Sequence, residues 1–253
     1  MPFVEFQGVS KIYSRQSREF VWRFLVEAFG GKKAAPLYAL RDVDFRVDSG
    51  EAVAVVGRNG AGKTTLLSLV AGLTVPEAGR VLVEGRVSPL LELGAGYHPD
   101  LTGRENVVIN AAVLGLGRAE SGLCWEPIVE FAGLRDCIDE PLRTYSQGMV
   151  MRLAFAVAVH VAPDILLIDE VLAVGDGAFQ SKCIERLKEM KRRGTILLCV
   201  SHVSPLLREI CDRALWLEGG KLKQQGPVAE VLLKYEQASG SLPPISHAPA
   251  ADG

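Results

Sequence analysis

The chain has 253 residues, of which 48% are hydrophobic, and its formal net charge is -2. It is long enough to bury a full core in one large domain, and its nearly balanced charge gives no general attraction to nucleic acid, so we expect no nucleic-acid partner. The five cysteines include no C-x-x-C pair, which favours free thiols over a disulfide framework. We find no signal-peptide pattern and no apolar run near the ~20 residues that span a bilayer.

Short apolar runs rich in β-branched residues alternate with longer helical patterns along the chain. This alternation predicts an α/β fold, with a mostly parallel sheet and helices packed on it. The predicted strands lie in the segments "RVDSGEAVAVVG", "RVLVEG", "DILLID", "TILLCVSH" and "RALWLEGGKL".

The segment "SREFVWRFLVEAFGGKK" near the N-terminus has the pattern of a short basic amphipathic helix. Phe20, Phe24 and Ala28 recur at helical spacing, with arginines and lysines around them. Two interpretations stay open: a helix packed on its own domain, and a surface that lies against anionic lipid or a membrane partner.

The middle of the chain predicts helices in place of strands. Thr102 and Glu105 form a capping box before "NVVINAAVLGL", and "GMVMRLAFAVAVHVA" is a second helix that ends before Pro163. We therefore expect a helical subdomain at about 98–161, inserted between two core strands of a domain spanning 1–238. The segment 239–253, rich in Pro, Ala, Ser and Gly, is expected to be a disordered tail.

The segment "VAVVGRNGAGKTTLL" predicts a phosphate-binding loop between a strand and a helix. Its glycines let backbone N–H groups approach phosphate oxygens, and the helix N-terminus adds partial positive charge. Lys63 is expected to reach the β- and γ-phosphates, and the Thr64 hydroxyl to ligate Mg²⁺. The residues expected to bind the nucleotide here are Arg58, Asn59, Gly60, Ala61, Gly62, Lys63, Thr64 and Thr65.

Two later strands end in polar side chains that suit a nucleotide site. "DILLIDE" ends in Asp169, which suits a metal ligand, and in Glu170, which suits polarising an attacking water. "LLCVSH" places Ser201 and His202 after another strand, at the edge where ligands gather in open α/β sheets. On its own, a histidine such as His202 would more often have a structural role.

The segment "TYSQGMVMRLAFAVAV", together with the phosphate loop, "LLIDE", "AVGD" and "VSH" in this order, resembles the nucleotide-binding domain of ATP-binding cassette (ABC) proteins. The resemblance implies a P-loop, RecA-like core with a mostly parallel sheet and an antiparallel β portion. The resemblance covers Val4 to about Tyr235. It implies that two copies meet head to tail, with each ATP between the phosphate loop of one chain and the signature motif of the other. Ser146, as an N-cap, and Gly148 keep the signature pattern, whereas Gln147 and Met149 depart from it.

The resemblance also implies roles for residues outside these motifs. It places an adenine-stacking aromatic ring at Tyr13, with Tyr38 as a second candidate and an ordinary packed tyrosine as the alternative. It puts Glu92 where the family has a glutamine that contacts Mg²⁺. His202 is expected to contact the γ-phosphate and to act with Glu170 in hydrolysis, and the loop "AVGD" to touch the partner's site.

The variant signature, with "LELGAGYHPDLTGREN" before it, looks like the branch that exports O-antigens, capsules and teichoic acids. That resemblance implies an ATPase subunit on the cytoplasmic face of the inner membrane, peripheral to an integral-membrane permease that moves a lipid-linked glycan. Some members carry a C-terminal sugar-binding β-domain, to which no segment of this chain corresponds.

Three rival functions stay open at this point. A transporter ATPase for another cargo, such as a lipid, drug or lipoprotein, would share these motifs. A soluble cassette ATPase usually has two cassettes or a long coiled-coil insertion, and this sequence has neither. A P-loop kinase would not account for "YSQGM" or "AVGD".

Overall fold

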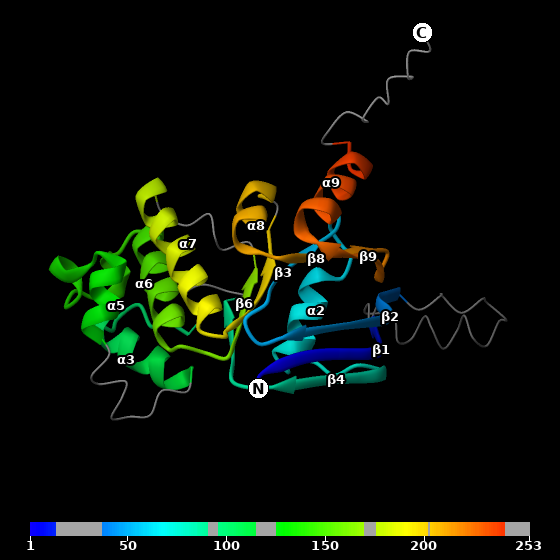
Figure 1. Ribbon diagram of the computed structural model, residues 1–253. Coiled ribbons are helices and arrows are strands. Elements are labelled where there is room, and N and C mark those ends of the chain that lie inside the picture. The colour runs from blue at the N-terminus through cyan, green and yellow to red at the C-terminus, as the bar shows by residue number, and fades with distance from the viewer. Residues whose placement is uncertain (14–36, 91–95, 115–124, 170–175, 202, 241–253) are drawn as a thin grey trace, which may run out of the picture.

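The computed structural model describes residues 1–13, 37–90, 96–114, 125–169, 176–201 and 203–240 (Figure 1). The expected basic helix, most of the expected tail and the residues Glu92, Glu170 and His202 lie outside these ranges.

The strands are β1 Phe3–Tyr13, β2 Leu37–Asp48, β3 Ala52–Val56, β4 Ala78–Glu84, β5 Val87–Leu90, β6 Ile165–Asp169, β7 Ile196–Val200, β8 Arg213–Glu218 and β9 Lys221–Pro227. The helices are α2 Lys63–Val70, α3 Gly103–Val113, α5 Trp125–Ala132, α6 Gln147–His160, α7 Gly177–Arg192, α8 Ser204–Ile210 and α9 Val228–Ala238, with short 3₁₀ turns at Arg135–Cys137 and Leu142–Thr144.

Two sheets form the strand framework of the described residues. The larger has the order β5-β6-β7-β3-β8-β9, and its neighbouring strands are parallel except for the antiparallel pair β8 and β9. The smaller has the order β2-β1-β4 and is antiparallel throughout. The expected α/β fold, with a mostly parallel core and an antiparallel portion, is confirmed.

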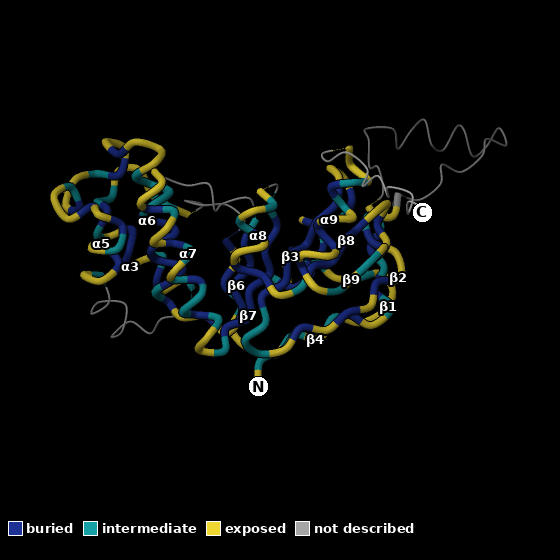
Figure 2. The backbone as a smooth tube through the Cα atoms, turned by 45° about the horizontal axis from the view of Figure 1, so that its top comes forward, coloured by how far each residue is buried: buried dark blue, intermediate teal, exposed yellow. Residues whose placement is uncertain are grey.

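The central strands are buried on both faces, as a parallel sheet covered on two sides requires (Figure 2). Successive side chains of β3 alternate between two apolar clusters: Ala52, Ala54 and Val56 face one, and Val53 and Val55 face the other. The first cluster includes residues of α6, α7, α8 and α9, and the second includes residues of α2 and of the small sheet. The loops at the strand ends therefore extend from a sheet that is packed on both faces.

Helices α3, α5 and α6 share a third apolar cluster, at one end of the molecule (Figure 1). The capping box at the start of α3 is confirmed: the Thr102 side chain accepts from Glu105 N, and Glu105 accepts from Thr102 N. Helix α6 belongs to two clusters, since Leu153 and Val157 face the helices whereas Phe155 packs in the sheet's cluster. Three strands were not predicted from the sequence: β1, β2 apart from its last residues, and β5, whose four residues include a proline that an edge strand tolerates.

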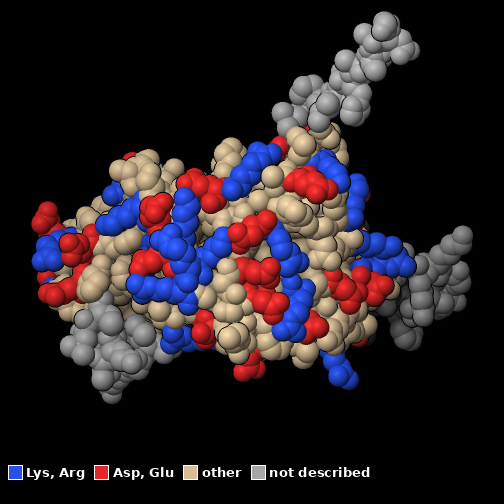
Figure 3. All heavy atoms as spheres, in the orientation of Figure 1, with Lys and Arg blue, Asp and Glu red and all other residues tan. Residues whose placement is uncertain are grey.

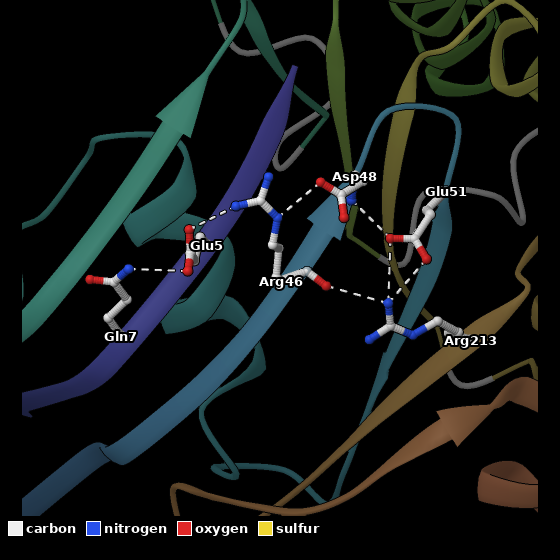
Figure 4. A network of polar contacts seen from close by, with 6 residues as sticks. All are labelled: Glu5, Gln7, Arg46, Asp48, Glu51 and Arg213. Carbon is white, nitrogen blue, oxygen red and sulfur yellow. Dashed lines mark hydrogen bonds and ion pairs between the residues drawn. The ribbon is translucent and has the colours of Figure 1, made fainter. Parts of the chain in front are cut away.

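A polar network joins the small sheet to the large one (Figure 4). On β8, Arg213 donates from Nη1 to Glu51 Oε1 at 3.0 Å and to the Arg46 carbonyl at 3.3 Å. On β2, Arg46 donates to Asp48 at 2.9 Å and to Glu5 of β1 at 3.0 Å. The network fixes the small sheet against the large one. It lies at the end of β3 opposite the phosphate loop, because Glu51 directly precedes β3 and the loop follows it.

Charges of both signs are intermixed on the face of the molecule shown in Figure 3. Several charged side chains of the described residues are paired, such as Lys188 with Glu209 at 2.9 Å and Lys191 with Asp212 at 2.6 Å. Among the described residues, no helix has both the length and the apolar character needed to cross a membrane.

Candidate functional site: a phosphate loop and a signature helix

The phosphate loop follows β3 and runs directly into α2. Two of its glycines are required by close packing of the backbone. A Cβ on Gly57 would overlap the Leu217 carbonyl of β8, and one on Gly62 would overlap the Ala39 carbonyl of β2. Gly62 also has a φ of 105°, in the left-handed region that favours glycine. The loop is therefore held tightly between β2 and β8, with its shape set by backbone contacts.

Lys63 begins α2 and is 8% exposed, an unusual environment for an ammonium group. Its Nζ donates to the carbonyl oxygens of Gly57 at 2.8 Å and Arg58 at 3.3 Å, so the side chain folds back under the loop. Helix α2 has no side-chain N-cap and no acidic residue in its first turn. Its positive end thus meets no carboxylate of its own turn and suits an external anion.

The rest of the loop is arranged as a phosphate cradle requires. Arg58, Asn59 and Gly60 are exposed, Ala61 is buried against the core, and Gly60 has a φ of 79°. Thr64 is exposed at the start of α2, and Thr65 beside it is half-buried. The backbone of Arg58, Asn59 and Gly60 is thus open to solvent, while the buried Ala61 anchors the loop to the core.

Strand β6 brings Asp169 to the same edge of the sheet. The Thr64 hydroxyl oxygen lies 3.4 Å from Asp169 Oδ2. A hydroxyl and a carboxylate that converge beside a phosphate cradle form the hard oxygen donor set that Mg²⁺ prefers. The residues present therefore fit a magnesium ion, which Thr64 and Asp169 would hold.

Other strands end at this edge beside Asp169. In the register of the parallel strands, Asp169 pairs with Val200 of β7, and Leu90 of β5 pairs with Ile168 of β6. Ser201 follows β7, and its Oγ accepts from Val203 N at 3.1 Å. Glu92, Glu170 and His202 follow these strands in the sequence and lie outside the described residues.

Ser146 is the N-cap of α6, as expected from the sequence. Its side chain accepts from Met149 N at 3.2 Å, and Ser146 N donates to Met149 Sδ at 3.5 Å, so a thioether completes the capping box. The preceding Tyr145 is buried and donates to the Cys137 carbonyl at 2.5 Å. Burial raises the pKa of Tyr145 well above its usual range, which keeps the hydroxyl a donor. Ser146 and Gly148 are exposed at the helix start, where they can meet a ligand.

An ion pair ties the signature helix to the next helix in the chain. Arg152 of α6 donates to Asp176 Oδ2 at 2.9 Å, and Asp176 Oδ1 accepts from Phe179 N at 2.9 Å as the N-cap of α7. The hydrogen bond from Phe179 N, aided by Arg152, lowers the pKa of the Asp176 carboxyl. Asp176 closes the "AVGD" segment, whose first three residues lie outside the described ranges.

Tyr13 and Tyr38 both lie at the ends of β1 and β2 nearest the phosphate loop. In the antiparallel register, Tyr38 pairs with Ile12, and Tyr13 pairs with Leu37. Ala39, next to Tyr38, contacts Gly62 of the loop. The side chains of Tyr13 and Tyr38 are 45% and 38% exposed.

The phosphate loop and the signature turn belong to different parts of the chain. Helix α2 contacts β2 and β4, whereas α6 contacts α3, α5, α7 and β5, and the two helices lie on opposite sides of the core in Figure 1. A nucleotide on one chain's phosphate loop could meet a signature turn supplied by a second chain. Two roles on α6 were not predicted from the sequence, Met149 as a capping partner and Arg152 as a link to α7, although both residues lie at fixed helical spacing after Ser146.

Comparison with known proteins agrees with this geometry. The sequence model of the ABC transporter family matches residues 40–173. An O-antigen export system ATP-binding protein, RfbB, from Klebsiella pneumoniae is 51% identical over 211 residues, covering 83% of this chain and 86% of its own length. A teichoic acids export ATP-binding protein, TagH, from Listeria monocytogenes serotype 4b is 37% identical over 237 residues, covering 92% of this chain and 70% of its own length.

Solved structures show the same fold. The ATP-binding subunit of an ABC transporter superposes with a TM-score of 0.75 at 24% identity, covering 92% of this chain and 93% of the other. A dimeric ATP-binding cassette in a post-hydrolysis state, bound to ADP and Pi, gives a TM-score of 0.72 at 21% identity, covering 89% and 98%. With the family match and the identity to RfbB and TagH, these results establish that the chain belongs to the ABC transporter family, as an ATP-binding cassette.

Proposed function

We propose that this chain is the ATP-hydrolysing subunit of an exporter that moves a lipid-linked polysaccharide of the O-antigen, capsule or teichoic-acid class across the cytoplasmic membrane. The observation that carries the ATPase part is the approach of Thr64 to Asp169 beside the glycine loop. The cargo class is supported by the 51% identity to a protein named for O-antigen export and the 37% identity to one named for teichoic acid export.

In this proposal ATP lies on the loop from Arg58 to Thr65. Lys63 and the first turn of α2 hold the β- and γ-phosphates, and the buried environment of Lys63 strengthens that attraction because little water screens it. Thr64 and Asp169 hold Mg²⁺, with Glu92 as a further candidate ligand; when bound, the ion neutralises charge on the phosphate oxygens.

Hydrolysis breaks the bond between the γ-phosphorus and the oxygen that bridges it to the β-phosphate. Glu170, which directly follows Asp169, orients the attacking water and accepts its proton, and His202 contacts the γ-phosphate. The leaving oxygen stays with ADP, and its charge faces Lys63 and the α2 N-terminus.

Two copies of the chain share each ATP. Ser146 and Gly148, at the exposed start of α6, contact the γ-phosphate on the partner's loop, and the positive end of α6 favours that contact. ATP therefore favours the closed pair, and loss of the γ-phosphate removes the shared ligand. The cycle of closing and opening moves an integral-membrane permease, with this chain bound peripherally on the cytoplasmic side.

A complementation experiment tests the cargo. The source organism's own copy is deleted, and either the wild-type chain or the Lys63→Ala variant is expressed in its place. We expect the wild type to restore a long polysaccharide at the cell surface, and the variant to leave lipid-linked polysaccharide inside the cell. Normal surface polysaccharide in the deletion strain would contradict the assignment to polysaccharide export and favour a different cargo.

A further inference from the structure

Along the edge of β1 that faces β4, the last residues of β1 are held by a side chain, while β2 stays paired with the other edge up to Tyr13. The pairing of β1 with β4 stops at Ser10, opposite Ala78, and Glu77 N donates to the Ser10 carbonyl at 2.9 Å. Beyond that point the Ile12 N–H finds its acceptor in Glu77 Oε2, at 2.8 Å. The carboxylate therefore continues the hydrogen-bond ladder for the last residues before Tyr13.

Lys11 binds the second oxygen of the same carboxylate. Its Nζ donates to Glu77 Oε1 at 2.8 Å and to the Val75 carbonyl at 2.9 Å. The Lys11 side chain is 9% exposed and that of Glu77 41% exposed, so the lysine is the buried partner. A buried ammonium group requires such partners, since the cost of removing it from water is otherwise unmatched.

The Lys11–Glu77 pair also touches the ring of Tyr13. The Lys11 ammonium lies over that ring, 5.4 Å from its centroid, within the range of a cation–π contact. Tyr13 is nevertheless 45% exposed. The pair thus fixes both the backbone that carries Tyr13 and the environment of its ring, while leaving part of the ring open to solvent.

Two routes connect this strand end to the phosphate loop. Lys11 pairs in register with Leu40, whose side chain, together with the Ala39 carbonyl, contacts Gly62. Val75 and Glu77 follow α2, the helix that begins at the phosphate loop. Tyr13 thus stands at the end of a strand whose neighbours β2 and the segment after α2 both belong to the surroundings of the phosphate loop.

We propose that Lys11 and Glu77 are positioning residues for base recognition, which hold Tyr13 so that its open face stacks on the adenine of bound ATP. This inference rests on the proposed function, because it needs the triphosphate to lie on the loop from Arg58 to Thr65. It assigns a role to two residues that belong to neither the phosphate loop nor the signature turn, and it favours Tyr13 over Tyr38 as the base platform.

The test compares ATP with tripolyphosphate, a ligand that offers the same phosphates without a base. Dissociation constants are measured by calorimetry, with Mg²⁺, for the full chain and its Tyr13→Ala, Glu77→Gln and doubly substituted variants. We expect Tyr13→Ala to weaken ATP about tenfold, the scale of one base on one aromatic ring, and to leave tripolyphosphate unchanged. Glu77→Gln should weaken ATP about threefold, a fraction of the Tyr13 effect, and leave tripolyphosphate unchanged, with no further loss in the Tyr13→Ala background.

Further variants make the outcomes decisive. Tyr38→Ala is the matched control and should bind both ligands as the wild type does; a loss of ATP affinity in this variant instead of in Tyr13→Ala would overturn the proposal. An equal loss for ATP and tripolyphosphate in Glu77→Gln would mean a general structural role and would also overturn it. Lys11→Met breaks the pair from the other side, so it replaces Glu77→Gln if that variant fails to fold. A wild-type chain that bound neither ligand would contradict the proposed function itself.

Discussion

The hydroxyl oxygen of Thr64 lies 3.4 Å from a carboxylate oxygen of Asp169, although 105 residues separate them in the chain. The fold produces this contact because the phosphate loop joins the end of β3 to the start of α2, and β6 ends at the same edge of the parallel sheet. The two side chains supply oxygens of the kind that bind Mg²⁺, and both stand beside a loop shaped for phosphate.

Replacing Asp169 with asparagine should separate metal-dependent from metal-independent nucleotide binding. Asn removes one charge while keeping size and position, so Mg²⁺ should no longer strengthen ATP binding, and kcat should fall about 100-fold or more. Calorimetry with and without Mg²⁺ measures the first effect, and phosphate release measures the second. The control is Asp136→Asn, a substitution at an exposed carboxylate, which should change neither. An unaltered Mg²⁺ dependence in Asp169→Asn would refute the metal role.

Two glycines of the phosphate loop, Gly60 and Gly62, should respond differently to alanine. Gly60 has a φ of 79° with open space around a Cβ, so Gly60→Ala should cost about 1 kcal/mol, from backbone strain alone. Gly62→Ala adds overlap with the Ala39 carbonyl and should cost distinctly more, above about 2 kcal/mol. Urea unfolding of both variants measures the difference in the free energy of unfolding. Equal losses in the free energy of unfolding would show that β2 does not pack closely against Gly62.

Asp176 has two partners, and two substitutions can separate them. Asp176→Ser keeps an N-cap oxygen for α7 but removes the charge that faces Arg152, so it should lower the unfolding temperature only slightly, because the Asp176 side chain is 64% exposed. Asp176→Ala removes both and should lower the unfolding temperature clearly more than the serine variant does. Thermal unfolding of the two variants and of Arg152→Met gives the comparison. If serine were as harmful as alanine, the ion pair and not the cap would carry the effect.

His160, at the end of α6, should make stability depend on pH. Burial lowers its pKa, with Arg186 and Lys182 adding to the effect, and its Nδ1 lies 2.7 Å from the Ala156 carbonyl. The pKa of His160 in the folded chain thus lies below its unfolded value of about 6.5. As the pH drops from about 6.5 toward the folded-state pKa, the unfolded chain binds more protons than the folded chain, so the free energy of unfolding decreases.

Urea unfolding at pH 7.5 and pH 5.5 measures this dependence. Wild type should lose stability over that interval, and His160→Gln, which cannot take up a proton, should lose less of it. The same loss in both proteins would assign the pH dependence to other groups.

Much of the site could be predicted because it depends on local sequence. The phosphate loop requires glycine at fixed positions, and the N-cap role of Ser146 depends only on the first turn of its own helix. Both could therefore be predicted from neighbouring residues in the sequence. The capping box of Thr102 and Glu105 was predicted for the same reason.

What could not be predicted depends on contacts between distant segments. Strand β5 is short and contains Pro89, and its pairing with β6 stabilises it in place of any intrinsic preference. The Lys11–Glu77 pair and the Arg152–Asp176 pair join segments 66 and 24 residues apart. Their residue types are common on protein surfaces, so only the fold reveals that they meet.

The central claim is that two copies of this chain share ATP between a phosphate loop and a signature turn. The most direct test is the mass in solution of the Glu170→Gln variant, with and without Mg-ATP, because that variant should bind ATP yet fail to hydrolyse it. We predict a shift from monomer to dimer that requires ATP and that Ser146→Arg, added to the same variant, abolishes. A variant that stays monomeric with ATP demonstrably bound would contradict the claim.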